Sequence, residues 1–278
     1  MPVKIVTNST ADIPKALADE LGITVVAEYV IFNNKCYKDR IDITEDEFYE
    51  KLVNDNIKAT TSQPTPQDFL EAYNELGKDA DGIISIHISA NLSGTTNSAA
   101  QAKKLTSAKC PIEIIDSKTI SLALGMAVIN AAKMAKAGKG FQEIVDAVNE
   151  MLPRIDVLIM FDTLEYLARG GRIGKAKSIV GSMLNTKPLL TIRDGGFAPV
   201  TQVHSKATAK KKLLEFAASF KNIEDLYAVY STDREEALEL LNKITHFPAE
   251  RIVLSQLGPV IGSHAGPGLL AIAVRTTN

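Results

Sequence analysis

The fold is indicated most clearly by the stretch Gly82-Ile83-Ile84-Ser85-Ile86-His87-Ile88-Ser89-Ala90-Asn91-Leu92-Ser93-Gly94-Thr95-Thr96. Its first part is rich in isoleucine and predicts a buried strand over residues 82–89. Residues 93–105 then predict a helix, and residues 112–115 predict another strand. A strand, a helix and a strand in this order are typical of a parallel βαβ unit.

The same alternation runs through the rest of the chain. Further strands are predicted at residues 3–7, 24–32, 156–161, 226–231, 252–256 and 269–274. Residues 120–136 are apolar on nearly all sides, which favours a buried helix, and Asp194-Gly195-Gly196 predicts a hairpin turn. Pro153 precedes a strand, so we expect α/β domains at 1–153 and 154–278. The predicted fold class is therefore α/β, with two domains of mainly parallel sheets covered by helices and a ligand buried between them.

Composition narrows the classes of function. The 278 residues have a formal net charge of −2, which argues against nucleic acid as the main ligand. Cys36 and Cys110 form no metal-binding pattern, and we expect two reduced thiols and no metal. The chain opens on a predicted strand, and its longest apolar stretch is too short to span a bilayer. We therefore expect a cytoplasmic protein without stable membrane insertion.

Two hydroxyl-rich segments are candidates for binding an anion. Residues 88–96 carry Ser93, Gly94 and Thr95 at a predicted helix start, where free N–H groups and the helix dipole favour negative charge. The alternative is an ordinary helix start with Ser93 as its N-cap. In residues 59–66, Pro64 restricts the backbone after Thr61 and Ser62, although such loops are common before helices.

Two glycine-rich segments complete the set. Arg169-Gly170-Gly171-Arg172-Ile173-Gly174-Lys175-Ala176-Lys177 concentrates cations that suit phosphates or carboxylates, or it forms a solvated basic loop. Residues 258–268 read as a loop of glycines and prolines around His264, which could hydrogen-bond a ligand or serve the structure alone. His87 lies within a strand and is expected to be packed. Without other motifs, these residues predict only a small-anion site and no catalytic residue.

Together, five stretches resemble the DegV family along the whole chain. They are Ile5-Val6-Thr7-Asn8-Ser9-Thr10-Ala11-Asp12, Thr61-Ser62-Gln63-Pro64, Leu92-Ser93-Gly94-Thr95, Arg169-Gly170-Gly171-Arg172-Ile173 and His264-Ala265-Gly266-Pro267-Gly268, in this order. The resemblance implies two α/β domains that enclose a long-chain fatty acid. It also implies that a separate kinase, related to dihydroxyacetone kinases, converts the bound acid to an acyl phosphate for phospholipid synthesis.

The resemblance assigns roles to individual residues. It implies that Thr61 and Ser93 hydrogen-bond the carboxyl group, with Ser62, Gly94 and Thr95 beside them. It places His264 and Arg169 in the polar network around the carboxyl, and Arg172 on the kinase-facing surface. The segment Val203-His204-Ser205-Lys206 departs from the family, whose members often carry arginine there, so His204 takes that kinase-facing place. The bound acid would be the ligand, with no cofactor, and we expect a monomer.

Elementary physics is compatible with these roles. A carboxylate that leaves water needs donors, which hydroxyls and helix-start amides supply, while the acyl chain needs only apolar walls such as residues 120–132. Two alternatives remain open. Ser93 and His264 could belong to a serine-type hydrolase of acyl esters, or the cationic loop and the Ser93 helix start could bind phosphate or a sugar phosphate. Chain length, saturation and branching preference depend on cavity shape, which the sequence does not give.

Overall fold

A computed structural model describes residues 2–55, 57–182 and 186–277. Its first sheet is parallel, with the strand order β2-β1-β6-β7. The strands are β1 (Val3–Asn8), β2 (Ile23–Val26), β6 (Gly82–His87) and β7 (Ile112–Asp116). The parallel βαβ unit predicted around residues 82–115 is therefore confirmed, with α4 (Thr95–Leu105) as its crossover helix.

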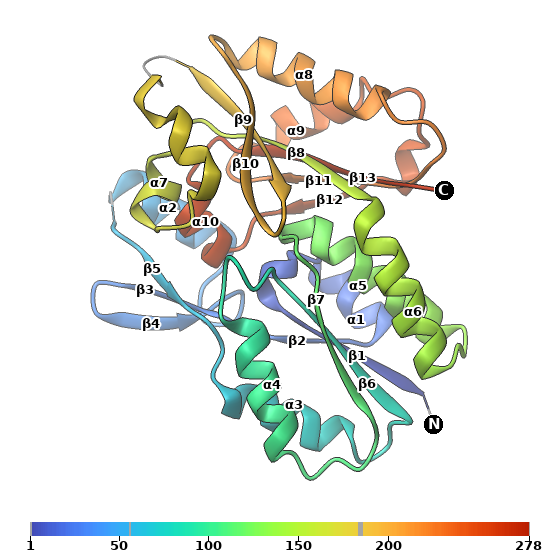
Figure 1. The fold of residues 1–278 in the computed structure, drawn as a ribbon. Helices are drawn as coiled ribbons and strands as arrows, with labels where there is room; N and C mark the ends of the chain where they lie inside the picture. The colour runs from blue at the N-terminus through green and yellow to red at the C-terminus, as the bar shows by residue number, and fades with distance from the viewer. Residues whose placement is uncertain (1, 56, 183–185, 278) are drawn as a thin grey trace.

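Helices cover both faces of this sheet (Figure 1). On one face, α3 (Pro66–Leu76) and α4 pack against Val6 and Ile83. On the other lie α1 (Lys15–Leu21), α5 (Ser121–Lys136) and α6 (Phe141–Met151). The buried helix predicted at residues 120–136 is confirmed as α5, which also contacts the other large sheet through β11 and β13. Burial between two sheets explains why it needs no polar face.

A small antiparallel sheet was not predicted. Its order is β4-β3-β5, formed by β3 (Tyr29–Phe32), β4 (Lys35–Lys38) and β5 (Thr60–Ser62). The single extended run expected at residues 24–32 is therefore two strands in different sheets, separated by Ala27 and Glu28. The segment around Thr61, expected to be a loop, contributes β5. Helix α2 (Glu45–Asn54) lies between β4 and β5 in the chain and starts with a capping box.

The third sheet corrects the predicted fold class, because it is mostly antiparallel. Its order is β10-β9-β8-β13-β11-β12, and only β11 and β12 run parallel to each other. The strands are β8 (Ile155–Met160), β9 (Lys187–Arg193), β10 (Gly196–Val203), β11 (Ile223–Tyr230), β12 (Val253–Gln256) and β13 (Leu270–Thr276). The reason is topological: β9 and β10 form the predicted hairpin, and β13 inserts between β8 and β11 in the opposite direction.

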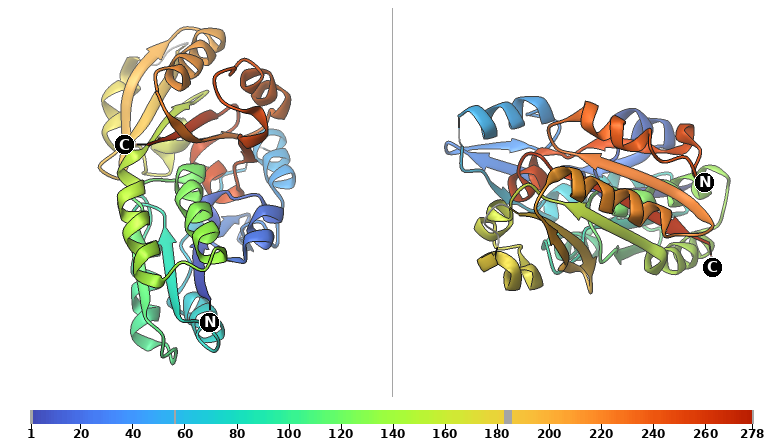
Figure 2. Two further views of the ribbon diagram at one scale, coloured as in Figure 1. Left: turned by 90° about the vertical axis from the view of Figure 1, so that its right-hand side faces the viewer. Right: turned by 90° about the horizontal axis from the view of Figure 1, so that it is seen from above.

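This sheet takes all its strands from residues 155–276, and the other two sheets take theirs from residues 3–116. Helices α8 (Lys206–Ala218) and α9 (Arg234–Leu241) cover one face, and α5 packs against the other. Figure 2 shows the two large sheets as separate layers of one elongated molecule. The division at residues 153 and 154 stays a prediction. Among the described residues, no helix is long and apolar enough to cross a membrane.

The segment expected to be a glycine- and proline-rich loop around His264 is instead largely helical. It forms α10 (Pro259–Ala265), with Pro259 in the first turn, where a missing N–H costs nothing. Gly266 ends the helix at a φ of 74°, a backbone conformation that favours glycine. Helix α10 is buried and contacts α2, β3, β5 and α7 (Glu165–Arg169), so it joins the two halves of the molecule.

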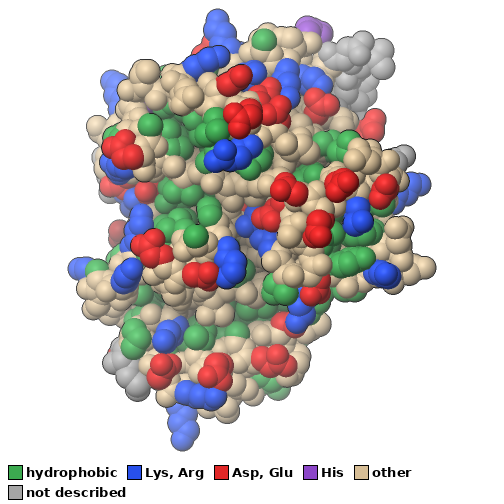
Figure 3. All heavy atoms as spheres, turned by 180° about the vertical axis from the view of Figure 1, so that it is seen from behind, with side chains coloured by type: hydrophobic (Ala, Val, Ile, Leu, Met, Phe, Trp, Pro, Cys, Tyr) green, Lys and Arg blue, Asp and Glu red, His purple; other side chains and the backbone are tan. Residues whose placement is uncertain are grey.

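The remaining elements are short. They are the 3-10 helices η1 (Ser9–Ala11), η2 (Leu152–Arg154), η3 (Gly174–Ser182) and η4 (Ala249–Arg251). The helix predicted at residues 176–184 corresponds to η3, and its last two residues lie outside the described part. Acidic and basic side chains are interspersed over the face seen in Figure 3, as a net charge close to zero leads one to expect.

Candidate functional site

A cavity of about 470 Å³ lies between the two halves, with walls from β5, the loop before α4, α7 and α10. A second, almost wholly apolar cavity of about 30 Å³ adjoins it. Four side chains line both: Ile120, Phe197, Ile261 and Ala265. The larger cavity therefore has hydroxyl, amide and charged groups at one end and leads to apolar walls at the other. Such a gradient suits a ligand with a polar head and an apolar tail.

Thr61 and His264 meet at the polar end of the larger cavity. Thr61 Oγ1, on β5, lies 2.8 Å from His264 Nε2, in the last turn of α10. His264 Nδ1 is buried and has no partner among the described residues. Burial, with Arg172 and Arg169 nearby, lowers the pKa of His264 to about 4, so the imidazole is neutral at pH 7. A neutral ring that donates from Nε2 leaves the Thr61 hydroxyl hydrogen free for a ligand.

Gly170 permits this position of the imidazole. A Cβ atom on residue 170 would lie 2.1 Å from His264 Nδ1, closer than non-bonded atoms approach. Gly170 therefore lets the backbone of the cationic segment pack closely against the histidine. Its φ of −75° suits any residue, so the close approach is the reason for a glycine here. Gly94 has a similar function, because a Cβ there would lie 2.0 Å from Gln63 Oε1. Gln63 in turn donates to Ser98 Oγ at 2.9 Å and lines the cavity.

Ser93 begins a hydrogen-bonded chain that leads from the cavity into the protein. Its Oγ lies 2.8 Å from Thr95 Oγ1 and accepts a bond from the Thr95 N–H at 3.3 Å. Thr95 Oγ1 lies 2.8 Å from Glu28 Oε1. The N-cap of α4 is Gly94, without a side-chain cap, so Ser93 does not have the ordinary capping role that was one alternative. Its hydroxyl lines the cavity instead.

Glu28 was not among the residues predicted from sequence. It follows Ala27 at the break between β2 and β3, is 3% exposed and lines the cavity. Burial raises its pKa to about 8, and the nearby Asp39 adds to the rise, while bonds from Thr95 and Asn8 and the charge of Arg172 oppose it. The available signal was a single carboxylate inside an otherwise apolar extended run, Ile23-Thr24-Val25-Val26-Ala27-Glu28-Tyr29-Val30-Ile31-Phe32.

Behind Glu28, a buried polar chain has a defined direction. The Ile88 N–H donates to Asn8 Oδ1, so the other amide atom, Nδ2, is the one that donates to Glu28 Oε1 at 2.8 Å. His87 Nδ1 donates to Asn8 Oδ1 at 3.0 Å, and His87 Nε2 accepts from Ser85. Burial lowers the pKa of His87 to about 3, which keeps its ring neutral. The expectation that His87 is packed is thus confirmed, and it holds Asn8 in place.

The other predicted site residues fall into two groups. Thr61, Ser62, Ser93, His264 and Arg172 line the cavity, and Gly94 and Thr95 lie directly behind it. Arg169 is exposed and stacks on Tyr166, 4.8 Å from the ring centre, outside the cavity wall. His204 is exposed beyond the end of β10. Arg172 is exposed and also lines the cavity, whereas Arg169 does not line it. The roles of the two arginines toward a ligand and a kinase stay predictions.

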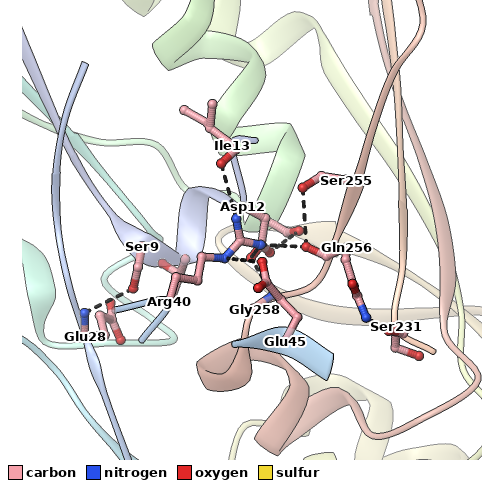
Figure 4. Close-up of polar contacts among 12 residues, drawn as sticks. Ser9, Asp12, Ile13, Glu28, Arg40, Glu45, Ser231, Ser255, Gln256 and Gly258 are labelled. Atoms are coloured by element: carbon pink, nitrogen blue, oxygen red, sulfur yellow. Dashed lines mark hydrogen bonds and ion pairs between the residues drawn. The ribbon is translucent and has the colours of Figure 1, made fainter. Parts of the chain in front are cut away.

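The start of α10 is held by a buried ionic cluster (Figure 4). Asp12 Oδ1 accepts from the Gly258 N–H at 2.8 Å and from Arg40 Nη2 at 3.1 Å, and Asp12 Oδ2 accepts from Ser121 Oγ at 2.6 Å. Arg40 Nη2 also donates to the Gln256 carbonyl at 2.6 Å. Burial raises the pKa of Asp12 to about 6, although Arg40 opposes the rise. The cluster joins η1 and the segment after β4 to the β12–α10 connection, and thereby positions His264 over Thr61.

No group of three or more histidine, cysteine, aspartate or glutamate side chains among the described residues could hold a metal ion. The fold and the cavity define an α/β ligand-binding protein, with the site between a parallel and a mixed sheet. Within this class, the chain belongs to the DegV family: a family model described as "Uncharacterised protein, DegV family" matches residues 2–277.

Similar proteins cover nearly the whole chain. A DegV domain-containing protein of Caldanaerobacter subterraneus subsp. tengcongensis is 38% identical over 269 residues, 95% of each chain. A solved structure, described as fatty acid binding of a DegV family protein from Thermus thermophilus, matches with a TM-score of 0.92 and 32% identity. Another, described as DegV, a fatty acid binding protein from Bacillus subtilis, matches with a TM-score of 0.89 and 30% identity. Both matches cover 100% of each chain.

Proposed function

We propose that this protein binds one long-chain fatty acid in the cavity between its two halves. The carboxyl group lies against Thr61, Ser93 and His264, and the acyl chain points toward the apolar walls. The observation that carries the proposal is the change from hydroxyl and imidazole groups to almost wholly apolar side chains along two adjoining cavities. The Thermus and Bacillus structures, which are described as fatty acid binding, support it.

The two ends of the ligand contribute differently to binding. Each buried methylene contributes about 0.8 kcal/mol, so about 14 of them contribute on the order of 11 kcal/mol before the costs of association. The carboxylate gains less, because it exchanges bonds with water for bonds with protein donors. The tail therefore dominates affinity, and the hydroxyls fix orientation. The inner cavity, at about 30 Å³, is far too small for an acyl chain, so side chains such as Phe197 must move apart as the tail enters.

We further propose that the bound carboxylate is presented to a separate kinase. One carboxylate oxygen attacks the terminal phosphorus of ATP, the bond to ADP breaks, and acyl phosphate and ADP result. Arg172 supports this proposal, because it is exposed and also lines the cavity, where a cation would attract a nucleotide and offset charge on the transferred phosphate. His204 lies apart, so its contribution would be to docking alone.

The geometry does not favour the hydrolase alternative. Ser93 is paired with Thr95, and the partner of His264 is Thr61. A serine nucleophile needs a histidine base within hydrogen-bond distance and a third group that orients the histidine. Among the described residues, His264 Nδ1 has no partner at all. Arg172 would also suit a phosphate, but a phosphate or sugar phosphate would give the adjoining apolar walls no role.

Mass spectrometry tests the proposal directly. Protein purified from its own host is denatured and extracted, and we expect a long-chain fatty acid in an amount close to that of the protein. Palmitate added to delipidated protein should raise the melting temperature, because a ligand that binds only the folded state stabilises it. Hexadecyl phosphate and p-nitrophenyl palmitate serve as probes for the alternatives. An empty protein that palmitate does not stabilise, or one that hydrolyses the ester, would overturn the proposal.

A further inference from the structure

Glu28 is a buried ionisable residue that lines the cavity. Binding of a carboxylate does not explain its presence, because Glu28 adds a second acidic group to an anion site. We propose that Glu28 carries a proton when the ligand is bound and, through Thr95, turns the hydroxyl hydrogen of Ser93 toward the ligand carboxylate. Glu28 is thus a positioning residue that acts through two hydroxyl groups. The inference rests on the proposed function, because it concerns how a carboxylate is recognised.

An ionised Glu28 turns the chain away from the ligand. A carboxylate oxygen can only accept, so Thr95 must donate its hydroxyl hydrogen to Glu28 Oε1 across the 2.8 Å contact. The contact between Ser93 and Thr95, also 2.8 Å, must then be made with the hydrogen of Ser93. Ser93 has no second hydrogen. In this state it can offer only an oxygen lone pair to the cavity, which repels a carboxylate.

A proton on Oε1 of Glu28, the oxygen that contacts Thr95, reverses both hydrogen bonds. The Glu28 O–H donates to Thr95 Oγ1, and Thr95 then donates to Ser93 Oγ. The Thr95 N–H also donates to Ser93 Oγ at 3.3 Å, so both lone pairs of the serine are occupied. The only remaining capacity of Ser93 is its hydrogen, which is free to point into the cavity. The anion and the proton on Glu28 therefore favour each other.

The polar chain behind Glu28 prevents a neutral amide from replacing the acid. Asn8 is held with Nδ2 toward Glu28 Oε1, because the Ile88 N–H and His87 both donate to its oxygen. An amide side chain at position 28 must therefore keep its oxygen at the place where Asn8 and Thr95 converge. Thr95 would again donate to that oxygen, as it does to an ionised Glu28. Glu28→Gln thus fixes the hydrogen bonds of Thr95 and Ser93 in the direction that opposes the ligand. Glutamine has the same charge as protonated Glu28, so the effect does not come from a change of charge.

Other charged or titratable groups surround Glu28. Asp39 follows β4, and the Asp39 N–H donates to the Glu28 carbonyl at 2.9 Å. Arg172 comes from the loop after α7, His264 from α10 and His87 from β6. The imidazoles have pKa values of about 4 and 3 and stay neutral above pH 6.5. Asp39 has a pKa of about 7 and therefore titrates close to Glu28, so Asp39→Asn is a necessary control.

The direction of the pH effect follows from linkage. The pKa of Glu28 is about 8. Well below that pH, Glu28 is already protonated and the ligand binds without proton uptake. Above it, each bound carboxylate requires the uptake of one proton, so affinity falls as the pH rises. Free palmitate is ionised throughout, since an ordinary carboxyl has a pKa near 4.3, and hexadecanol, which has a similar tail and no charge, should bind equally at both ends of the range.

The experiment measures palmitate affinity at about pH 6.5 and about pH 9.5 for the wild type, Glu28→Gln, Thr95→Val and the double variant. We expect wild-type affinity to fall by about tenfold at the higher pH, the loss of one hydrogen bond to a charged group. Glu28→Gln should be weaker by a similar factor at both pH values. Thr95→Val removes the group that claims the Ser93 hydrogen, so its palmitate affinity should depend less on pH than that of the wild type, with only the direct repulsion between ionised Glu28 and the ligand left. It should also reduce the loss of affinity that Glu28→Gln causes.

The possible results separate the two hypotheses. If wild type binds no palmitate at either pH, the proposed function fails. If wild type binds palmitate, but Glu28→Gln keeps the wild-type pH profile or Thr95→Val does not rescue it, the role of Glu28 is wrong and the fatty acid site stands. Should Glu28→Gln fail to fold, Thr95→Val alone decides, because a pH dependence as large as that of the wild type in that variant contradicts the relay. A profile abolished by Asp39→Asn instead would assign the proton to Asp39.

Discussion

Replacement of Asp12 by alanine tests whether the ionic cluster holds the His264 helix in place. The carboxylate is fully buried and accepts three hydrogen bonds, from Gly258, Arg40 and Ser121. Alanine leaves all three donors without this partner, and two of them, from Gly258 and Ser121, are buried. A buried donor left unsatisfied costs about 1–3 kcal/mol, and a broken buried ion pair costs about 3–5 kcal/mol.

The environment of Arg40 reduces the expected cost of losing the Asp12 carboxylate. Arg40 keeps Glu45 at 3.2 Å and the carbonyls of Ile13 and Gln256, and its side chain is 18% exposed. The loss of the ion pair should therefore cost an amount near the low end of the range for buried pairs. The Ser121 hydroxyl can rotate, which reduces the cost of losing its bond. We expect Asp12→Ala to lower the free energy of unfolding by about 4 kcal/mol. Asp12→Asn keeps an oxygen for Gly258 and should cost about half as much.

Urea unfolding at pH 7 measures the effect, with the midpoint and slope compared between variants. The matched control is Asp19→Ala, which removes an exposed carboxylate 2.7 Å from Lys15 on α1 and should cost less than about 1 kcal/mol. Palmitate affinity should also fall in Asp12→Ala, although Asp12 does not line the ligand cavity, because α10 carries His264. An Asp12→Ala protein as stable as Asp19→Ala would refute the reasoning.

Three further predictions concern the ligand and pH. The double variant Thr61→Ala and Ser93→Ala should still bind palmitate, because the tail contribution persists, but with an affinity lower by about ten- to a hundredfold. Acyl phosphate formation by the cognate kinase should fall further. Unchanged turnover would remove both hydroxyls from the site. Arg172→Glu should weaken palmitate binding and slow the kinase step. Arg169→Glu, which changes the cation stacked on Tyr166, should leave binding nearly unchanged. Equal effects of the two variants in a direct binding assay would contradict the placement of Arg172 at the cavity. The free energy of unfolding should rise as the pH falls from about 8.5 to 6.5, because native Glu28 and Asp39, with pKa values of about 8 and 7, take up protons that the unfolded chain does not bind there. Below pH 6.5 the gain should stop, because the unfolded chain protonates two histidines, His87 and His264, that stay neutral in the native state, and this outweighs the one proton that native Asp12 takes up near its pKa of about 6. Urea titrations of Glu28→Gln and Asp39→Asn should give a flatter profile.

Sequence patterns predicted the parts of the fold that local signals determine. The run at residues 82–89, the helix after it and the next strand form a parallel unit because a helical crossover returns the chain in the same direction. The apolar helix α5 was also predictable, since apolar residues on all sides require burial on all sides. The mostly antiparallel order of the last sheet was not predictable, because the apolar strand β13 has the same pattern whichever neighbour it joins. Its insertion between β8 and β11 depends on contacts distant in sequence.

The candidate site shows the same division between local and distant signals. Thr61, Ser93 and His264 were predicted from local patterns, and the structure brings them to one cavity. The helical form of α10 was missed, because its glycines and prolines resemble a loop until Pro259 is recognised as a first-turn residue. The placement of Arg169 and Arg172 could not be predicted, since both lie in one short basic segment and only the tertiary structure decides which one faces the cavity.

Glu28 shows what a local conflict in a sequence can indicate. A carboxylate within an apolar extended run opposes burial, and chains keep such conflicts mainly where function requires them. Here the conflict coincides with the break between β2 and β3, so the chain leaves one sheet and enters another at the acid itself. Neither sheet then has to accommodate Glu28 within a hydrogen-bonded ladder, and its side chain can reach Asn8 on one side and Thr95 on the other. A chain that needed only a donor for a carboxylate could use a lysine or arginine at this place. A carboxylic acid with a high pKa instead makes the donor conditional on a proton, which ties the orientation of the bound ligand to pH.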